Sequence, residues 1–447
     1  MSVSFRQGLV NARSHIAMIL GLLLAFGLIV FLEGWEGLKP PENLPRLQEL
    51  QDIPSPTCTL LSQTEREWAA AAWRYFENNL QPKTGLVNSA DGFPSTTLWD
   101  TASYLLALIS ARRLELIPRH VFDQRLSQAL LSLDRLDLFE GLLPNKAYSS
   151  ETLAMSGYDN TPSPKGIGWS AIDLARLLVP LHIIVWDYPE HSPEARKILS
   201  RWSWTALADK GQLVGAAVRS GKTVLVQEGR LGYEQYAARA AALAGLDMSV
   251  AGDHYAFLSL RPQYGVDVPT DQRDASTLDA HNYVLSEPYI LDGLEFGGGR
   301  LSGEFAWRVY LAQEKRWQKT GILTAVSEDH IDQDPYFVYN TVFVNGEFWK
   351  AITDDGKDAE AFKTLSTKAA FGWHALYRTK YTAKLLEAVK SLYDPQRGWQ
   401  AGVYEKNGQP NRSINANTNA VVLESLAFMQ NGPLLPIRRS PQMASQP

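Results

Sequence analysis

Cysteine is almost absent from this chain of 447 residues, because Cys58 is the only one. A single cysteine excludes an internal disulfide framework. Cys58 lies in the sequence PSPTCTL, which lacks the small residues that surround a lipid-modified cysteine. We therefore expect Cys58 to have no chemical function, and we expect the fold to depend on its core.

Clusters of basic residues are also absent, and the formal net charge is −5. This charge balance argues against nucleic acid as a partner. The chain has no GxSxG, P-loop, HExxH or paired CxxC motif, so serine hydrolase, P-loop and zinc protease chemistry lack their usual signatures. We expect neither a cofactor nor a bound metal ion.

Aromatic residues, by contrast, are abundant, with 13 Trp and 18 Tyr. Flat rings of this kind lie against pyranose faces in sugar-binding clefts, and they also fill ordinary protein cores. Both interpretations stay open for the set as a whole. Because other catalytic signatures are missing, carboxylates are the remaining chemical resource, and they are the groups that glycoside hydrolysis uses.

The long hydrophobic run of the chain is residues 16–32, IAMILGLLLAFGLIVFL, which contains no charge. Its length is at the short end of the range that spans a bilayer. Arginines precede it and glutamates follow it, which predicts a cytoplasmic N-terminus at residues 1–15. No small-x-small cleavage site follows, which favours an uncleaved anchor over a signal peptide. The predicted location is the inner membrane, crossed once, with the C-terminal domain periplasmic or extracellular.

Three further segments follow the predicted anchor. Residues 33–60 are proline-rich and lack sustained periodicity, so they are expected to form a semi-extended linker. Residues 61–432 carry the helical periodicity of one large domain. Residues 433–447 are expected to be a disordered tail.

Apolar and amphipathic helical patterns alternate along the domain. Residues 96–116 and 166–182 are mostly apolar, whereas residues 118–136 and 192–207 have one polar face. Such alternation predicts an inner and an outer ring of helices. With one or two helices expected between residues 247 and 281, the total is about a dozen. The predicted fold class is an all-α (α/α)6 toroid with short β-hairpin insertions. The remaining helices are expected at residues 64–80, 228–246, 303–319, 366–378, 381–393 and 415–429.

Turn signals give the expected boundaries of the non-helical parts. Thr64 and Glu67 match a capping box at the start of the first helix. Hairpins are expected at residues 216–228, around Ser220-Gly221, and at residues 336–352, around Asn345-Gly346. Residues 283–300 contain a proline and several glycines and are expected to form an ordered loop. The tract 327–335, SEDHIDQDP, is expected to be a solvated acidic loop.

The inner helices of a toroid begin at one face, so residues at those starts are the candidates for a site. Carboxylates that could be catalytic are Glu234, Asp100, Glu295 and Glu287. Side chains expected to bind substrate are Trp99, Tyr233, Trp169, Tyr289, Tyr339, Trp373, Asn417 and Asn419.

Structural alternatives exist for each carboxylate. Thr97 and Asp100 fit a capping box, and an acid in the first helical turn interacts favourably with the helix dipole. Glu234 could be a first-turn acid of the same kind. Asp173 is expected to pair with Arg176 three residues on and to have a structural role.

If a catalytic pair is to be assigned, Glu234 is the general acid, because Tyr233 and Tyr236 could raise its pKa by desolvation. The base is then Asp100 or a carboxylate of the segment from Glu287 to Glu295. Spacing in the sequence does not fix the distance between such partners, which decides between inversion and retention.

Four segments carry a resemblance to a known family: WDTASY at 99–104, GRLGYEQYAAR at 229–239, EPYILDGLEFG at 287–297 and SEDHIDQDPYFVYNTVFVNG at 327–346. They resemble a bacterial domain-of-unknown-function family found in proteins associated with exopolysaccharide production. The similarity covers roughly residues 62–430. That family is more distantly similar to glucoamylase-like (α/α)6 glycoside hydrolases that act on β-glucans. The resemblance implies the fold and a polysaccharide ligand, and it assigns no residue's role.

The function expected from the sequence is therefore a membrane-anchored, glycoside hydrolase-like protein that acts on a β-glucan or exopolysaccharide. One alternative is a non-catalytic polysaccharide-binding component beside a membrane polysaccharide synthase. The third is a polysaccharide lyase, although a lyase of an anionic polymer would need a cationic cleft.

Overall fold

The computed structural model describes residues 53–278 and 280–435, all within a compact unit that begins at Gln48. The predicted anchor at 16–32, the N-terminus before it and most of the predicted linker and tail lie outside the described residues. No helix within the described part of the chain is both long and apolar enough to cross a membrane.

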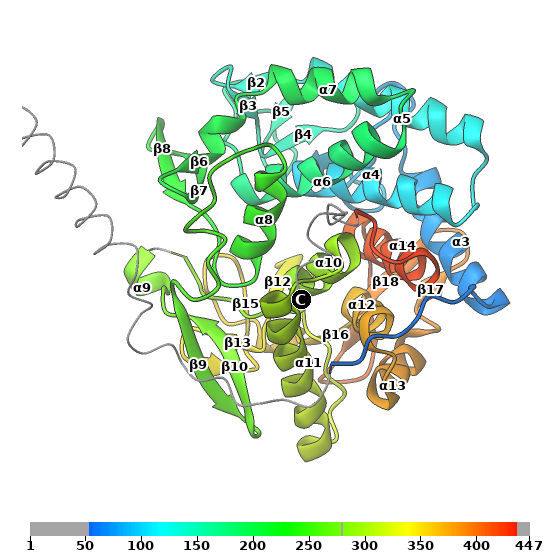
Figure 1. The fold of residues 1–447 in the computed structure, drawn as a ribbon, viewed down its shortest axis with the longest axis vertical. Coiled ribbons are helices and arrows are strands. Elements are labelled where there is room, and N and C mark those ends of the chain that lie inside the picture. The colour runs from blue at the N-terminus through cyan, green and yellow to red at the C-terminus, as the bar shows by residue number, and fades with distance from the viewer. Residues whose placement is uncertain (1–52, 279, 436–447) are drawn as a thin grey trace, which may run out of the picture. The chain divides into compact units, whose positions relative to one another are not determined.

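Six helices form a closed ring in which each helix contacts the next and the last contacts the first (Figure 1). Their inward positions explain their composition, because the first of them carries no charge between Asp100 and Arg112 and is buried along most of its length. The ring confirms the predicted inner layer. Its members are α4 (Leu98–Arg113), α6 (Ala171–Asp187), α8 (Tyr233–Ala242), α10 (Glu287–Phe296), α12 (Thr367–Tyr377) and α14 (Ala416–Asn431).

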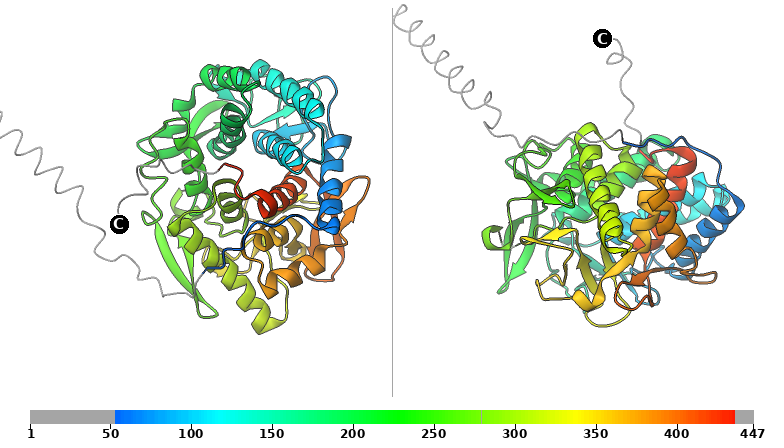
Figure 2. Two further views of the ribbon diagram at one scale, coloured as in Figure 1. Left: turned by 45° about the vertical axis from the view of Figure 1, so that its right-hand side comes forward. Right: turned by 90° about the horizontal axis from the view of Figure 1, so that it is seen from below.

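Five amphipathic helices pack outside this ring and alternate with the inner helices along the chain. Figure 2 shows these outer helices around the ring in two further views. They bury one face each, as a helix that covers a core does. They are α3 (Gln63–Asn78), α5 (Arg119–Arg135), α7 (Ser192–Arg201), α11 (Arg300–Thr320) and α13 (Lys380–Val389).

The outer layer is interrupted between α8 and α10. Helices were expected in residues 247–281, but the structure has a hairpin of β9 (Leu258–Gln263) and β10 (Val266–Asp271), followed by the single turn α9 (Ala275–Leu278). The sequence of β10 begins Val-Asp-Val, and Val266 and Val268 are buried whereas Asp267 is partly exposed, which suits a strand better than a helix. This hairpin packs against α11 and stands where another outer helix would complete the layer.

Residues 283–300 were expected to be a loop, and this prediction is wrong. The segment forms α10, whose ten residues are all buried. Pro288 is compatible with the helix because it lies in the first turn, where the backbone N–H has no helical partner. Gly297 ends the helix in a left-handed conformation with φ 79°. The proline and the glycine therefore mark the ends of a helix, not a loop.

The first helix begins slightly earlier than expected. Its N-cap is Ser62, whose backbone N–H and hydroxyl both donate to the Glu65 carboxylate, while the Ser62 hydroxyl accepts from the Glu65 N–H. The capping box is thus formed by Ser62 and Glu65, and Thr64 and Glu67 lie inside the helix.

Antiparallel strands are more numerous than the predicted hairpins, so the fold is helix-rich and not purely α-helical. The expected turns at Ser220-Gly221 and Asn345-Gly346 are confirmed, since all four residues have positive φ, as type I′ turns require. The expected β7–β8 hairpin begins somewhat earlier than predicted. Several strands lead directly into the first residue of an inner helix, such as β1 into α4 and β16 into α12.

The strands group into small sheets as follows. One sheet contains β1 (Ser95–Thr97), β4 (Ala147–Ser149) and β5 (Met155–Ser156); another pairs β2 (Leu138–Phe139) with β3 (Leu143–Pro144); a third contains β6 (Ala208–Asp209), β7 (Gln212–Arg219) and β8 (Lys222–Gln227). The later sheets contain β11 (Glu328–His330), β12 (Phe337–Asn340) and β15 (Ala351–Ile352); β13 (Phe343–Val344) and β14 (Glu347–Phe348); and β16 (Thr364–Ser366), β17 (Tyr393–Asp394), β18 (Gly398–Tyr404) and β19 (Pro410–Ile414).

Two glycines allow α10 and α12 to approach closely. A Cβ atom on Gly372 would lie 2.3 Å from Ile290 Cγ2, and one on Gly293 would lie 2.6 Å from Leu376 Cδ2. Each helix thus presents a glycine to a large side chain of the other. Because both contacts are with branched side chains in a packed interface, a methyl group at either glycine would force the two helices apart.

We expect Gly372→Ala to lower the free energy of unfolding by about 1–3 kcal/mol, the usual cost of an overpacked core. The control is Gly303→Ala in α11, where an added Cβ has no atom within 4 Å. That variant should instead gain about 0.5–1 kcal/mol, because alanine restricts the unfolded chain more than glycine does. Denaturant unfolding measures the change in the free energy of unfolding for each variant. A change of the same sign in the two variants would contradict the close approach of α10 and α12.

Candidate functional site

The first turns of the inner helices lie at one end of the ring. Asn417 Nδ2, near the start of α14, donates to Glu287 Oε1 at the start of α10 over 2.7 Å. Lys368, near the start of α12, forms an ion pair with the same Glu287 carboxylate. The rings of Trp99 and Tyr233, which begin α4 and α8, are 5.7 Å apart. Arg176 joins the two groups, because its guanidinium lies over the Trp99 ring and donates to Asn417 Oδ1. The starts of five inner helices therefore lie together, as the sequence predicted, and we call this end of the ring the rim.

Partly exposed aromatic rings stand at the rim. Trp99 and Tyr233 meet edge to face, and the Arg176 guanidinium lies 4.3 Å from the centre of the Trp99 ring. Tyr283 and Tyr339 stack with their ring centres 4.1 Å apart. Three of these five residues, Trp99, Tyr233 and Tyr339, were predicted to bind substrate. Their exposed faces provide the flat surfaces against which a sugar ring can pack.

Two partly exposed carboxylates, Asp173 and Glu228, lie beside each other at the start of α6. Both are within hydrogen-bonding distance of the Ser170 hydroxyl, at 3.0 Å and 3.2 Å. Glu228 also accepts the backbone N–H of Ala171 over 2.7 Å, at the positive end of the helix dipole. Burial, the charge of Glu228 and the charge of Asp100 raise the pKa of Asp173 to about 7. Asp173 is therefore a carboxyl group that can hold a proton near neutral pH.

Asp100 occupies the matching position on the neighbouring helix. The Thr97 hydroxyl accepts the Asp100 N–H over 3.0 Å, so Thr97 is the N-cap, and it donates to Asp100 Oδ2 over 2.7 Å. Asp100 thus contacts the hydroxyl of the N-cap residue, whereas the predicted capping box has the acid accept the N-cap backbone N–H. Asp173 stands in the same relation to the N-cap Ser170. The two aspartates therefore occupy equivalent sites, three residues after the N-caps of adjacent helices. The two carboxyl groups are close enough for the charge of Asp100 to raise the pKa of Asp173.

Two carboxylates of the acidic tract are buried at the rim, although that tract was expected to be solvated. Glu328 is 7% exposed and accepts a hydrogen bond from the Tyr233 hydroxyl, and its burial raises its pKa. Asp329 accepts the hydroxyls of Thr364 and Ser366, each over 3.0 Å, and burial raises its pKa to about 8. The reason is that residues 328–330 form β11, which is paired with β12. In the same tract, Asp332 and Asp334 are exposed as predicted.

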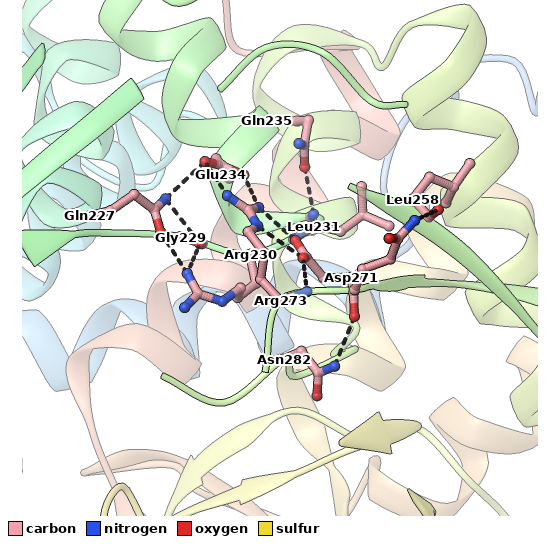
Figure 3. A network of polar contacts seen from close by, with 12 residues as sticks. Gln227, Gly229, Arg230, Leu231, Glu234, Gln235, Leu258, Asp271, Arg273 and Asn282 are labelled. Atoms are coloured by element: carbon pink, nitrogen blue, oxygen red, sulfur yellow. Dashed lines mark hydrogen bonds and ion pairs between the residues drawn. The ribbon is translucent and has the colours of Figure 1, made fainter. Parts of the chain in front are cut away.

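Glu234 is held in an internal ion-pair network (Figure 3). Its carboxylate pairs with Arg273, which also pairs with Asp271, and it accepts Gln227 Nε2 over 2.9 Å. The side chain has no exposed surface. Burial raises the pKa of Glu234, and the bonds and charge of Arg273 oppose that effect. Glu234 thus joins α8 to the loop after β10, and its carboxylate is engaged by Arg273 and Gln227, so its predicted role as the general acid stays a prediction.

Glu295 lies deep inside the ring. It accepts the Tyr236 hydroxyl over 2.6 Å and lies 3.6 Å from Arg176 Nε, and it has no exposed surface. Burial raises the pKa of Glu295 to about 7. Glu287 is closer to the rim, but Lys368 and Asn417 occupy its carboxylate. Neither residue presents a free carboxylate to a ligand.

Three of the predicted binding residues make structural hydrogen bonds, and a fourth lies in another pocket. Trp169 Nε1 donates to the Val214 carbonyl, and Trp373 Nε1 donates to the Ser286 hydroxyl, each over 3.0 Å. Asn419 Oδ1 accepts the Trp399 N–H over 2.8 Å. Tyr289, only 5% exposed, lies in a different pocket between α8 and α10. Asn417, by contrast, lies at the rim as predicted. Within the described residues, no group of three or more His, Cys, Asp or Glu side chains is arranged to hold a metal ion.

Asp173, Glu228 and Glu328 are the rim residues that sequence reasoning missed. Asp173 was expected to pair with Arg176, but Arg176 turns to the ring centre and pairs with Glu295 and Glu424. The repeated pattern of a hydroxyl residue followed three positions later by Asp, at 97–100 and 170–173, was the available signal for a matched pair.

Removal of Arg273 should be costly, because it leaves the buried carboxylates of Glu234 and Asp271 without their ion-pair partner. We expect Arg273→Met to lower the free energy of unfolding by about 3–5 kcal/mol. The control is Arg74→Met, which breaks the exposed Arg74–Glu77 pair and should cost about 0–1 kcal/mol. Denaturant unfolding provides the comparison, and equal costs for the two variants would contradict a structural role for the Glu234 network.

A family model described as "Protein of unknown function (DUF3131)" matches residues 67–432. A search of curated proteins finds no match. The family comparison therefore covers nearly the whole helical domain but brings no established activity with it.

Solved structures are similar across most of the chain. An endo-β-1,2-glucanase from Chitinophaga pinensis, in complex with sophorotriose and glucose, is 13% identical, with a TM-score of 0.59 and coverage of 84% of this chain and 94% of that one. A mutant endo-β-1,2-glucanase from Talaromyces funiculosus, in complex with β-1,2-glucan, is 10% identical, with a TM-score of 0.60 and coverage of 83% and 84%. A protein from Bacteroides fragilis, provisionally described as a glucoamylase, is 12% identical, with a TM-score of 0.61 and coverage of 85% and 94%. At these identities the similarity shows the fold.

Proposed function

The chain belongs to the DUF3131 family of proteins of unknown function, and we propose that this member is a glycoside hydrolase that cleaves a β-glucan at the rim of its helical ring. The observation that carries the proposal is the pair of aspartates at matching positions of α4 and α6, Asp100 and Asp173, beside the partly exposed rings of Trp99 and Tyr233.

Asp173 is the proposed general acid. Glycoside hydrolysis needs one protonated carboxyl group that delivers a proton to the leaving oxygen and one ionised carboxylate that activates water. Burial and the neighbouring charges of Glu228 and Asp100 raise the pKa of Asp173 to about 7, so much of it is protonated at neutral pH. Glu228 thereby acts through Asp173, because its negative charge disfavours the loss of that proton.

Asp100 is the proposed base. The axes of packed helices lie roughly 8–10 Å apart. Residues at equivalent positions on adjacent helices are therefore separated by about the same distance. Carboxyl groups roughly 6.5–9.5 Å apart leave room for a water molecule beside the sugar. The matching N-cap positions of Asp100 and Asp173 support this geometry.

The substrate class is proposed from the aromatic surface and from the relatives of the fold. Trp99, Tyr233 and the Tyr283–Tyr339 stack offer ring faces at the rim, which suits an uncharged sugar polymer. Each cation near this surface faces carboxylates. Lys368 pairs with Glu287, and Arg176 pairs with Glu295 and Glu424. The charge of Lys146 acts on Asp173 and Glu228. A neutral glucan therefore suits the rim better than an anionic polymer, which disfavours the lyase alternative. Two similar structures are named as endo-β-1,2-glucanases, so a β-1,2-linked glucan is the first substrate to test.

The location and partners complete the proposal. The hydrophobic run at residues 16–32 supports a single-pass anchor in the inner membrane, with the enzyme domain periplasmic or extracellular. An association with exopolysaccharide production, beside a membrane synthase, belongs to the same proposal. A polysaccharide-binding component without catalysis is the second candidate. The observation that favours it is that Glu234, Glu287 and Glu295 are all engaged in buried ion pairs.

The test uses the purified full chain with β-1,2-glucan and a panel of other β-glucans, and it measures new reducing ends. We expect Asp173→Asn and Asp100→Asn each to lower kcat by about 10²–10⁴-fold, the usual contribution of a general acid or base. Asp187→Asn is the matched control, since Asp187 is an exposed aspartate at the far end of α6. Loss of cleavage with binding retained would identify catalysis. Binding of glucan without cleavage by the wild-type chain would favour the binding component.

The pH dependence gives an independent prediction. Because the general acid must be protonated, kcat should fall as the pH rises through about 7, the pKa to which burial, Glu228 and Asp100 raise Asp173. Glu228→Gln removes one of the neighbouring charges and should move this basic limb of the pH profile to lower pH. A profile that is unchanged in Glu228→Gln would contradict the assignment of the acid to Asp173.

A further inference from the structure

A pocket of about 620 Å³ opens between α8 and α10, where the outer layer has no helix. Figure 1 shows these two helices side by side, with α11 next to α10. Ala238 and Ala242 of α8 line one wall, and Leu301 and Phe305 of α11 line another. The volume lies within the range of about 300–1,000 Å³ that is typical of small-molecule sites. The interrupted outer layer is thus the structural reason for the pocket.

Two buried polar atoms of this pocket lack a hydrogen-bond partner among the described residues. They are the hydroxyl oxygen of Tyr289 and Nε2 of His254, and both residues line the pocket. Tyr289 is 5% exposed, so water has little access to its side chain. Buried polar groups in proteins are nearly always hydrogen-bonded, and an unpaired one carries a cost in free energy. A ligand that pairs with these atoms would remove that cost.

The hydrogen-bonding roles of the two atoms can be assigned. His254 Nδ1 lies 3.2 Å from the carbonyl oxygen of Gly252. A carbonyl only accepts, so Nδ1 carries the proton, and in the neutral ring Nε2 is then an acceptor. Burial lowers the pKa of His254, which keeps the ring neutral. The Tyr289 hydroxyl can donate or accept. A hydroxyl group on a ligand could therefore serve either atom, whereas a carbonyl could serve only Tyr289.

The charge and polarity of the lining residues restrict the class of ligand further. The Arg239 guanidinium bonds to Asp292 over 2.8 Å, so these two charges of the lining are matched with each other. The other charged residue of the lining, Arg300, is exposed. Most of the remaining wall is apolar, including Met248 and Phe305. A sugar ring would bring several hydroxyl groups into this wall and leave most of them without partners. The pocket is therefore unlike the rim, where aromatic faces and carboxylates suit a polysaccharide.

We infer that the pocket between α8 and α10 binds a small molecule with an apolar body and a hydroxyl group. Two contacts define the site: the apolar wall of α8 and α11 packs against the body, and Tyr289 or His254 pairs with the hydroxyl. Gly232 and Tyr289 bring part of the lining to the first turns of α8 and α10, but the existence of the site does not depend on the proposed hydrolysis.

The experiment compares two probes of nearly equal shape, 2-naphthol and 2-methylnaphthalene, with glucose as the polar counter-probe. The full chain is placed in lipid nanodiscs because of its hydrophobic run at residues 16–32, and binding to empty nanodiscs is subtracted. We expect saturable binding of 2-naphthol, weaker binding of 2-methylnaphthalene and no binding of glucose. Absence of saturable 2-naphthol binding, or glucose binding of equal affinity, would overturn the inference.

Variants locate the binding. Ala242 is exposed at the pocket, so Ala242→Phe should fill the pocket without disturbing the core and should raise the Kd for 2-naphthol about tenfold or more. Ala70→Phe, on an exposed position of α3, is the matched control and should leave the Kd unchanged. Tyr289→Phe should weaken 2-naphthol several-fold and leave 2-methylnaphthalene unchanged, because only the hydroxyl is removed. Equal affinity in Ala242→Phe and Ala70→Phe would refute the location. Unchanged glucan cleavage in Ala242→Phe would separate this site from the rim.

Discussion

The ring of inner helices depends on the hydrogen bonds and ion pairs of the buried Arg176 guanidinium. This arginine of α6 is fully buried, and it crosses the centre of the ring to reach three other helices. Its guanidinium donates to the Ser103 hydroxyl on α4 over 2.8 Å, to Glu424 on α14 over 3.3 Å, and lies 3.6 Å from Glu295 on α10. A buried charge is tolerated only when it is paired and hydrogen-bonded. The ring must therefore close with these helices in register, or the charge is left without its partners.

The same network connects the core to the rim. Arg176 Nη1 also donates to Asn417 Oδ1 over 3.2 Å, and Asn417 in turn donates to Glu287, which pairs with Lys368. The Arg176 guanidinium also lies over the Trp99 ring in a cation–π contact. One arginine thus fixes the first turns of α10, α12 and α14 as well as an aromatic face of the proposed cleft. A site built on side chains that are held in this way is preorganised, because little rearrangement is needed when a ligand arrives.

Local patterns in the sequence predicted the ring, whereas pairings between distant residues could not be predicted. The hydrophobic pattern of the sequence alone predicts the apolar helix α4 and the amphipathic helix α5. The helix α10 was missed because Pro288 and Gly297, taken by themselves, indicate a loop. The role of Gly293 as a contact for Leu376 of α12 becomes visible only in the folded core. The ion pair of Glu234 could not be predicted for a related reason, since its partner Arg273 lies 39 residues away. At the rim, Trp99, Asp100, Tyr233 and Asn417 were predicted because they begin inner helices, which is a local property.

Asp100 and Asp173 occupy equivalent positions on adjacent inner helices but differ in the carboxylates around them. Both aspartates follow a hydroxyl N-cap by three residues and share the favourable end of a helix dipole. Only Asp173 has a second carboxylate, Glu228, within reach of its own N-cap serine, because β8 ends beside the start of α6. Two adjacent negative charges cannot both be stabilised by one helix end, and Glu228 already accepts the backbone N–H of Ala171. The proton is therefore retained by Asp173, which has fewer donors. The insertion of the β7–β8 hairpin between α7 and α8 is thus what distinguishes two otherwise equivalent carboxyl groups.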